Sequence, residues 1–220
     1  MTKTIFSPFQ RQIFSIISRN SFITKNFYFT GGTALSEFYL KHRYSEDLDF
    51  FSTKDIKFGD IRAKFEQDLK ESKITLLDYQ FERETKIFIL NKKKKEQLKI
   101  QFTYWPFKLL EKPIKKGSLM IDSLIDITIN KLETLLTRDK ARDFVDFYFI
   151  QREKNYSLDY LLRLMKKKCL WQVDPLYLGS RLIKIKDLVD YPVMIKKFSK
   201  KEMIGYFFDL GKKLKKEIFS

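Results

Sequence analysis

The chain of 220 residues carries 44 lysine and arginine residues against 28 aspartate and glutamate residues, a formal net charge of +16 at pH 7. A charge of this sign favours polyanions such as nucleic acids as partners. The N-terminus lacks the apolar core of about 7–15 residues found in signal peptides, and no run of about 18 apolar residues follows. We therefore expect a cytoplasmic protein with no membrane partner.

The excess of basic residues has two interpretations. Residues 151–220 contain 17 basic and 8 acidic residues, so much of the charge lies in the last third of the chain. A basic surface there would bind a polyanion through the release of counterions. A genome rich in A and T would also produce a protein rich in lysine, isoleucine and phenylalanine, and the sequence leaves both causes open.

Soft metal ligands are scarce in this chain. Cys169 is the only cysteine and His42 the only histidine, so neither an intramolecular disulfide nor a zinc site of cysteine and histidine ligands can form. Any metal site is therefore expected to use oxygen ligands, which magnesium prefers.

The first predicted element is a helix that starts after Ser7. Ser7 can cap it, Pro8 suits its first position, and Gln10 completes a capping box. Apolar residues follow at helical spacing, so we expect this helix to have a structural role.

The next predicted elements are a short strand, a turn and a helix. The aromatic run Phe27–Phe29 favours a strand, and Gly31 and Gly32 allow the backbone to approach a ligand closely. Thr33 is predicted to cap a helix over Ala34–His42. Because free N–H groups at a helix start bind anions, this turn is predicted to cradle a phosphate.

Acidic and apolar residues then alternate over Glu46–Phe51, as in a strand with one buried face. Asp47 and Asp49 would share the other face with Cα atoms about 6.5–7 Å apart, a spacing that lets two carboxylates hold a hard divalent cation. Such a pair alone could equally be a turn or a calcium-like site. His42 and Ser45 lie just upstream, and we interpret both as polar loop residues.

The middle of the chain is predicted to be a helix followed by an antiparallel meander. Apolar residues recur every four positions over Asp60–Lys70, and three strand-like runs follow within residues 73–105. The run Lys92–Lys95 is interpreted as a solvated hairpin tip rather than a nucleic-acid contact. Proline and glycine residues over residues 106–117 predict a loop that leads to a helical second half.

A helix capped by Ser123 is predicted to carry lysine and arginine side chains on one face. If it is unbroken, Lys131, Arg138 and Arg142 lie within about 40° of one another on one face. The segment "TRDK" could instead interrupt the helix and return "ARDFVD" toward the sheet. Either geometry permits a phosphate clamp.

Two aspartates of the segment "ARDFVD" have alternative roles. Asp143 and Asp146 could form salt bridges with the nearby arginines, or they could act at the site itself. Further helices are predicted from Ser157, from Asp174 with Pro175 at the first position, and from Ser199.

Two blocks of the sequence resemble a known family. The motif "GGTALS", ten intervening residues and "DLDFF" resemble the signature of polymerase-β-type nucleotidyltransferases, and the whole stretch resembles the AbiEii/AbiGii toxin family among them. The second block, "NKLETLLTRDKARDFVDFYFI", is similar to that family's downstream motif of a lysine, an arginine and a closing "RDF..D". Together the blocks cover about a fifth of the chain.

The resemblance implies an α+β fold with a mixed β-sheet, flanking helices and a helical C-terminal half. We expect a nucleotidyltransferase core over residues 1–117 and a helical region over residues 118–220, packed on the core or continuous with it. The implied activity is Mg²⁺-dependent or Mn²⁺-dependent transfer of a nucleoside monophosphate from an NTP to an RNA acceptor such as tRNA. The protein would be the toxin of a toxin-antitoxin or phage-defence system, with a cognate antitoxin as partner.

The resemblance also implies residue roles. The catalytic set would be Asp47, Asp49, Lys131 and Asp143, with the metal on Asp47 and Asp49. The NTP phosphates would be bound by Gly31, Gly32, Thr33, Arg138 and Arg142. Apart from the resemblance, the basic charge of residues 151–220 leads us to expect that an RNA acceptor docks on Lys166, Lys167 and Lys168.

One position departs from the family pattern. Related enzymes carry a third carboxylate on a later strand, and here the matching residue is Gln101. An amide cannot act as a general base and adds no negative charge at a metal site. Asp143 or Asp146 could take over the role. Alternatively, the protein is a catalytically impaired module that binds RNA or an antitoxin.

Overall fold

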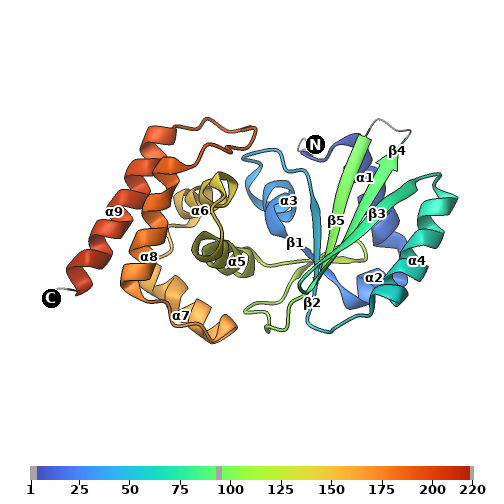
Figure 1. The fold of residues 1–220 in the computed structure, drawn as a ribbon, viewed down its shortest axis with the longest axis horizontal. Coiled ribbons are helices and arrows are strands. Elements are labelled where there is room, and N and C mark those ends of the chain that lie inside the picture. Colours follow the sequence, from blue (N-terminus) through green and yellow to red (C-terminus); the bar gives the residue numbers. More distant parts are fainter. Residues whose placement is uncertain (1–3, 93–95, 219–220) are drawn as a thin grey trace.

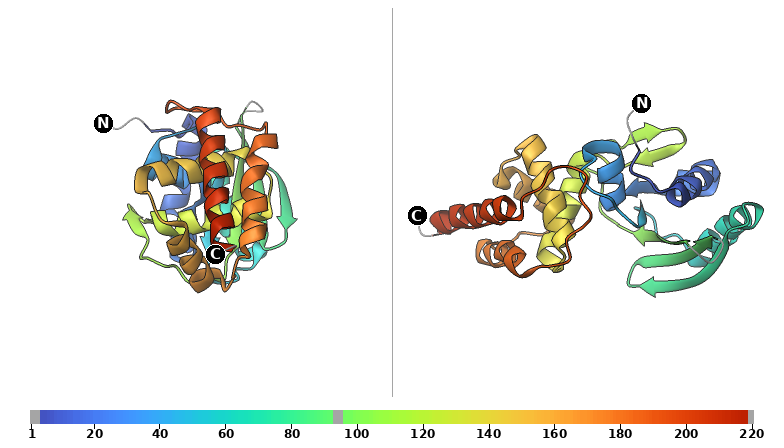
Figure 2. Two further views of the ribbon diagram at one scale, coloured as in Figure 1. Left: turned by 90° about the vertical axis from the view of Figure 1, so that its left-hand side faces the viewer. Right: turned by 90° about the horizontal axis from the view of Figure 1, so that it is seen from above.

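The computed structural model describes residues 4–92 and 96–218. Within them, seven strands form one mixed sheet. Helices lie before and between the strands, and the chain after the last strand is helical. In Figure 1 the sheet half lies to the right and the helical half to the left, and the view from above in Figure 2 shows the same arrangement. Among these residues, no helix is both long and apolar enough to cross a membrane.

The sheet has the strand order β3-β4-β5-β2-β1-β7-β6. Strand β2 runs parallel to β5, and β1 runs parallel to β7, while the other neighbouring pairs are antiparallel. This mixed sheet confirms the predicted α+β class. In chain order the strands are β1 (Tyr28–Thr30), β2 (Leu48–Ser52), β3 (Thr75–Glu82), β4 (Thr85–Lys92), β5 (Glu96–Tyr104), β6 (Ile114–Lys116) and β7 (Leu119–Ile121).

The helices fall into two groups. Those of the sheet half are α1 (Pro8–Arg19), α2 (Ser21–Asn26), α3 (Gly31–Ala34), the π-helix η1 (Leu35–Leu40) and α4 (Phe58–Glu71). Those of the helical half are α5 (Leu124–Thr137), α6 (Ala141–Lys154), α7 (Leu158–Cys169), α8 (Pro175–Leu182), the 3₁₀-helix η2 (Ile183–Asp187) and α9 (Lys200–Ile218).

Aromatic rings form the core of the sheet half. Phe29, Phe50 and Phe102 are fully buried on neighbouring strands, with ring centroids 5.1 Å apart for the first two and 5.5 Å for the last two. Phe14 of α1 packs 5.2 Å from Phe29, and Phe65 of α4 packs 5.9 Å from Phe102. Because buried aromatic area is a main source of folding free energy, much of the phenylalanine content has a structural role.

The predicted caps at Ser7, Ser123 and Asp174 are confirmed. The Ser7 hydroxyl accepts from Gln10 N, and the Gln10 side chain accepts from Ser7 N, which completes the capping box. The side chains of Ser123, Ser157 and Asp174 each accept a hydrogen bond from the backbone N–H three residues later, at the starts of α5, α7 and α8. Short-range hydrogen bonds of this kind depend on a few consecutive residues, so the sequence alone could place them.

Two local predictions are wrong. The helix after the glycines begins at Gly31, so Thr33 lies inside it and is not its cap. The predicted loop over residues 106–117 contains β6, which pairs with β7. The proposed boundary after residue 117 therefore falls in the β6–β7 turn, and the sheet extends to Ile121; the division into two units stays a prediction. In the predicted lysine tip, residues 93–95 lie outside the described residues.

The segment between η2 and α9 joins the two halves. Val193 O accepts a hydrogen bond from Tyr44 N at 2.9 Å, and His42 O accepts one from Ile195 N at 2.8 Å. Backbone hydrogen bonds thus join the loop before β2 to the helical half.

The prediction that three lysines at the end of α7 bind RNA is wrong for one of them. Lys166 and Lys167 are exposed, but the Lys168 side chain is fully buried, and its Nζ lies 2.7 Å from Asp126 Oδ1 on α5. The same Nζ donates to Asn130 Oδ1 at 3.0 Å. Lys168 therefore ties α7 to α5 and is not available to an RNA backbone.

We predict that Lys168→Ala lowers the free energy of unfolding by about 3–5 kcal/mol, because it leaves a buried carboxylate without its cation. Lys167→Ala removes an equal charge from the exposed neighbour and is expected to change stability by less than about 0.5 kcal/mol. Urea denaturation of both variants measures the difference. Equal stabilities would show that the buried pair does not stabilise the fold.

Candidate active site

The two predicted metal ligands lie at one end of β2. Asp49 pairs in register with Thr30 on β1 and with Gln101 on β5. Asp47 is the residue before β2, and its Oδ2 lies 3.2 Å from Lys99 Nζ. Gln101 Nε2 donates to Asp49 Oδ1 at 2.6 Å. Gln101 is therefore the residue that faces Asp49 from the neighbouring strand, where the resemblance implied a third carboxylate.

The glycine turn brings the backbone against these side chains. Gly31 has φ +76°, and a Cβ atom there would collide with Asp49 Oδ2. A Cβ atom on Gly32 would collide with Arg43 Nη2. The Thr33 hydroxyl donates to Asp47 O. The two glycines thus leave room for a carboxylate and a guanidinium, and Thr33 fixes the backbone at Asp47.

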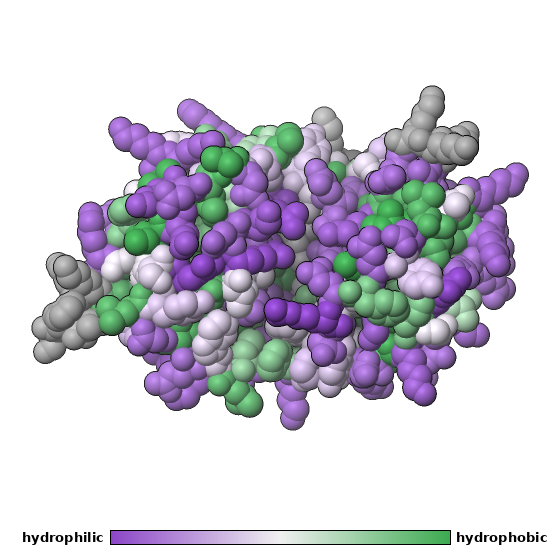
Figure 3. Space-filling view, viewed as in Figure 1, coloured by the Kyte–Doolittle hydropathy of each residue, from purple (hydrophilic) through white to green (hydrophobic). Residues whose placement is uncertain are grey.

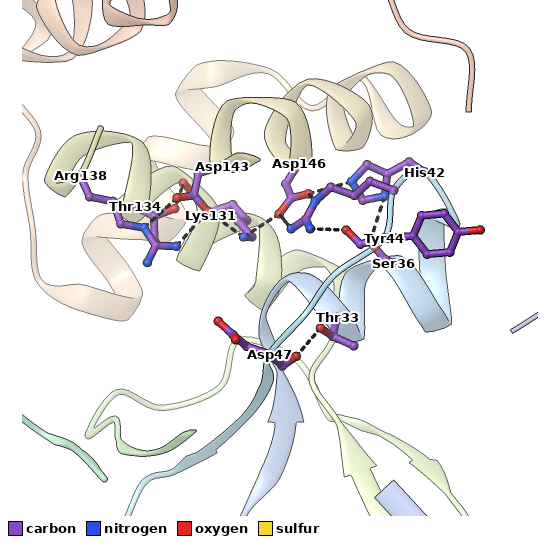
Figure 4. A network of polar contacts seen from close by, with 11 residues as sticks. Thr33, Ser36, His42, Tyr44, Asp47, Lys131, Thr134, Arg138, Asp143 and Asp146 are labelled. Atoms are coloured by element: carbon purple, nitrogen blue, oxygen red, sulfur yellow. Dashed lines mark hydrogen bonds and ion pairs between the residues drawn. The ribbon is translucent and has the colours of Figure 1, made fainter. Parts of the chain in front are cut away.

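Across from Asp47, α5 and α6 present an ion-pair network (Figure 4). Lys131 Nζ lies 2.9 Å from Asp143 Oδ1 and 2.6 Å from Asp146 Oδ2. Arg138 binds both oxygens of Asp143, at 2.7 Å through Nε and 3.0 Å through Nη2. The helix is interrupted at Arg138, the second of the two geometries that the sequence left open, and the turn brings Asp143 back onto Lys131.

The network extends to two residues of the loop before β2. Arg43 binds Asp146 with both ends of its fork, at 2.6 Å through Nε and 2.8 Å through Nη2. His42 Nε2 lies 2.7 Å from Asp146 Oδ1, and the whole imidazole is buried. The interpretation of His42 as a polar loop residue is wrong, and sequence reasoning missed Arg43, whose partner lies 103 residues away.

Both aspartates of the network stay ionised. Burial alone would raise the pKa of Asp146, but Arg43 and Lys131 hold it well below its usual value. Burial also opposes the charge on Asp143, and Lys131 with Arg138 lowers its pKa below the usual value. Their oxygens are occupied by cations, so neither is placed to take a proton or to replace the missing third carboxylate.

Asp49 has the opposite electrostatic environment. Burial, followed by the charge of Asp47, raises its pKa from 3.8 to about 6, although Lys131, Lys99 and Arg138 oppose the rise. A cation that binds between two such carboxylates relieves their repulsion and stabilises their ionised forms.

The residues fit a magnesium ion that also binds phosphate. Within the described chain, no group of three histidine, cysteine, aspartate or glutamate side chains could enclose a metal. Magnesium commonly uses one or two carboxylates together with phosphate oxygens and water, so Asp47 and Asp49 are a sufficient protein contribution. The Gln101 carbonyl oxygen could add a neutral ligand if its amide turned over.

Arg142 is the predicted phosphate ligand that the structure separates from the others. It lines a pocket of about 290 Å³ with residues 43–46 and 190–193, and of the residues that line this pocket Arg43 is the one that also belongs to the ion-pair network. Lys166 and Lys167 lie on the outer surface of α7. Hydrophilic side chains cover much of the face shown in Figure 3, including the boundary between the two halves.

Comparison with protein families gives one match to this chain. The model described as "Nucleotidyl transferase AbiEii toxin, Type IV TA system" matches residues 15–203. A search of curated proteins finds no significant match.

Two solved structures are similar to this chain over most of its length. A protein from H. pylori described as a nucleotidyltransferase is similar with a TM-score of 0.59 and 22% identity, over 94% of this chain and 93% of that chain. MenT4, a nucleotidyltransferase toxin from Mycobacterium tuberculosis, is similar with a TM-score of 0.56 and 14% identity, over 92% of this chain and 83% of that chain. At these identities the likeness concerns the fold.

The pKa of Asp49 leads to a prediction about stability. Because the folded-state value of about 6 exceeds the usual 3.8, the folded protein binds more protons between these pH values, and stability falls as the pH rises through them. Asp49→Asn removes this loss. We expect the metal-free variant to be more stable than the wild type above pH 6, by about 1–3 kcal/mol, and equal to it near pH 4.

Thermal or urea unfolding across this pH range measures the effect, with Asp187→Asn as an exposed control. Adding Mg²⁺ should stabilise the wild type more than Asp49→Asn, since only the wild type offers two carboxylates. A stability difference that does not change with pH would contradict the raised pKa.

Proposed function

This chain belongs to the AbiEii family of nucleotidyl transferase toxins, and on that premise we propose that it transfers a nucleoside monophosphate from an NTP to an RNA acceptor such as tRNA. In this reaction an acceptor oxygen forms a bond to the α-phosphorus, the bond to the bridging oxygen of the β-phosphate breaks, pyrophosphate leaves and the hydroxyl proton passes to solvent. The observation that carries the proposal is that Asp47 lies opposite the cations of α5 and α6 (Figure 4), while the charges of Lys131 and Arg138 also act on the pKa of Asp49.

Asp47 and Asp49 are proposed to hold Mg²⁺, or Mn²⁺ in its place. When bound, the ion neutralises charge on the phosphate oxygens and orients them for in-line displacement. The electrostatic strain at Asp49, whose pKa is raised to about 6, supports this assignment because a cation would relieve it. Gln101 donates to Asp49 and fixes the direction of its free oxygen.

The phosphates are proposed to lie between the glycine turn and the cations. The N–H groups of Gly31, Gly32 and Thr33 open a helix and can bind an anion. The charges of Lys131 and Arg138 act on Asp49, since both lower its pKa. They would stabilise negative charge that develops on the transferred group.

Asp143 is proposed to act through these cations. It binds Lys131 and Arg138 at once and stays ionised, so it holds both in one place. Preorganised cations stabilise a transition state without the cost of reorienting during the reaction. Asp143 therefore belongs to the catalytic set as a positioning residue.

A cytoplasmic RNA and an antitoxin are the proposed macromolecular partners. The family is that of type IV toxin-antitoxin systems, which supports an antitoxin as partner. Lys166 and Lys167 are exposed on a basic helix end and supply a diffuse field for a long polyanion. Lys168 is withdrawn from this surface because it is buried against Asp126.

The glutamine beside Asp49 favours one alternative. Gln101 provides no negative charge where the family pattern has a carboxylate, which would suit a module that binds RNA or antitoxin and has lost turnover. Such a protein would bind NTP with Mg²⁺ and form no product.

The test is incubation of the pure protein with each labelled NTP, Mg²⁺ and total RNA. We predict that one RNA band acquires label and that Asp47→Ala or Asp49→Ala lowers the rate at least about 100-fold, because metal binding stabilises the transition state by several kcal/mol. Asp187→Ala, which removes an exposed carboxylate, is expected to keep the wild-type rate.

Two results would contradict the proposal. Unchanged rates in both aspartate variants would remove the carboxylates from the site. NTP and Mg²⁺ binding by the wild type, without transfer to any RNA, would favour the non-catalytic module.

A further inference from the structure

A second hollow adjoins the candidate active site. The pocket of about 290 Å³ that contains Arg142 is lined by three segments, residues 43–46 of the loop before β2, residues 140 and 142 at the start of α6, and residues 190–193. This volume lies near the lower end of the range for small-ligand sites.

The walls of this pocket are held in place by hydrogen bonds. Tyr44 N donates to Val193 O at 2.9 Å, which joins two of the three segments. Ala141 N donates to Asp190 Oδ1 at 3.0 Å, which joins the start of α6 to residues 190–193 as well. A ligand would therefore enter a preformed site and would not need to order these loops.

The pocket adjoins the candidate active site through Arg43. Arg43 lines the pocket and also binds Asp146, which pairs with Lys131. A Cβ atom on Gly32 would collide with Arg43 Nη2, so the same arginine lies against the glycine turn. A group bound in the pocket therefore lies beside an arginine that contacts both the ion-pair network and the glycine turn.

Within the described part of the chain, four polar side chains of the pocket have no partner, namely Arg142, Tyr44, Ser45 and Glu46. Arg142 forms no hydrogen bond or ion pair there, whereas Lys140 lies 3.7 Å from Asp190 and Arg43 binds Asp146. The Tyr44 ring is half-exposed and contacts no other ring of the described residues, and Figure 4 shows it turned away from the ion-pair network. A free guanidinium and a free aromatic face are the groups that bind a phosphate and a nucleobase.

We infer that this pocket binds the terminal nucleotide of the polynucleotide acceptor, with Arg142 on its phosphodiester and Tyr44 against its base. The inference rests on the proposed function. An incoming NTP would place its phosphates at Asp47, Asp49 and the Lys131 network, so it has no phosphate left for Arg142. The end of a polynucleotide strand brings a phosphodiester and a base together, so the Arg142 guanidinium and the Tyr44 ring would each gain a partner.

The test measures binding of a short single-stranded RNA with fluorescein at its 5′ end. Arg142→Ala should weaken binding about ten-fold and reduce the slope of log K against log salt by about 0.7, the value for one phosphate contact on a single strand. Tyr44→Ala should also weaken binding about ten-fold, since stacking on an aromatic ring is lost, whereas Tyr44→Phe should bind like the wild type.

Matched controls separate the pocket from general charge and aromatic loss. Arg11→Ala removes an exposed arginine from α1, and Tyr160→Ala removes a half-exposed tyrosine from α7. Both should leave RNA affinity within two-fold of the wild type, and the salt slope should not change. Affinity of Arg142→Ala for a fluorescent NTP analogue with Mg²⁺ should equal that of the wild type.

The outcomes distinguish this inference from the proposed function. Wild-type RNA affinity and salt slope in Arg142→Ala would overturn the inference, even if label transfer to RNA proceeds. Loss of NTP affinity in that variant with RNA affinity unchanged would assign the pocket to the NTP instead. If the wild type transfers no label, the proposed function fails, and the binding comparison still decides whether the pocket holds an RNA end.

Discussion

The chain of buried ion pairs through Asp143, Lys131 and Asp146 is the constraint on which the rest of the structure depends. It connects α5 to α6 and, through Arg43, to the loop before β2. Ionised groups lose hydration when they are buried, so each must keep its partner. Removing any one partner would leave an uncompensated charge between the sheet half and the helical half. The network therefore fixes how the two halves meet.

The geometry of the candidate site follows from that connection. Arg43 occupies the space that the missing side chain of Gly32 leaves open, and Asp49 lies against Gly31 in the same manner. The carboxylates at the end of β2 are thus brought opposite Lys131, whose charge reaches Asp49. In the proposed function, one face binds a divalent cation and the other binds phosphate, which is the charge arrangement that a nucleotide with its metal ion requires.

Local patterns predicted much of this fold, and long-range pairing explains what they missed. The capping box at Ser7 and the alternation around Asp49 involve residues close in sequence, so they could be placed without a structure. The partner of Arg43 is 103 residues away and that of Lys168 lies on another helix, so nothing near either residue indicated its burial. The turn at Arg138 sends Arg142 into a separate pocket, although helical spacing put both on one face.

A crystal structure with Mg²⁺ and a non-hydrolysable NTP analogue tests the central claim most directly, namely that the two facing surfaces form one nucleotide site. The account predicts the metal about 2.0–2.1 Å from carboxylate oxygens of Asp47 and Asp49. It also predicts phosphate oxygens within hydrogen-bond distance of Lys131 or Arg138 and of the N–H groups at the start of α3. A triphosphate bound elsewhere, with Lys131 still held only by its aspartates and no metal at Asp49, would contradict it.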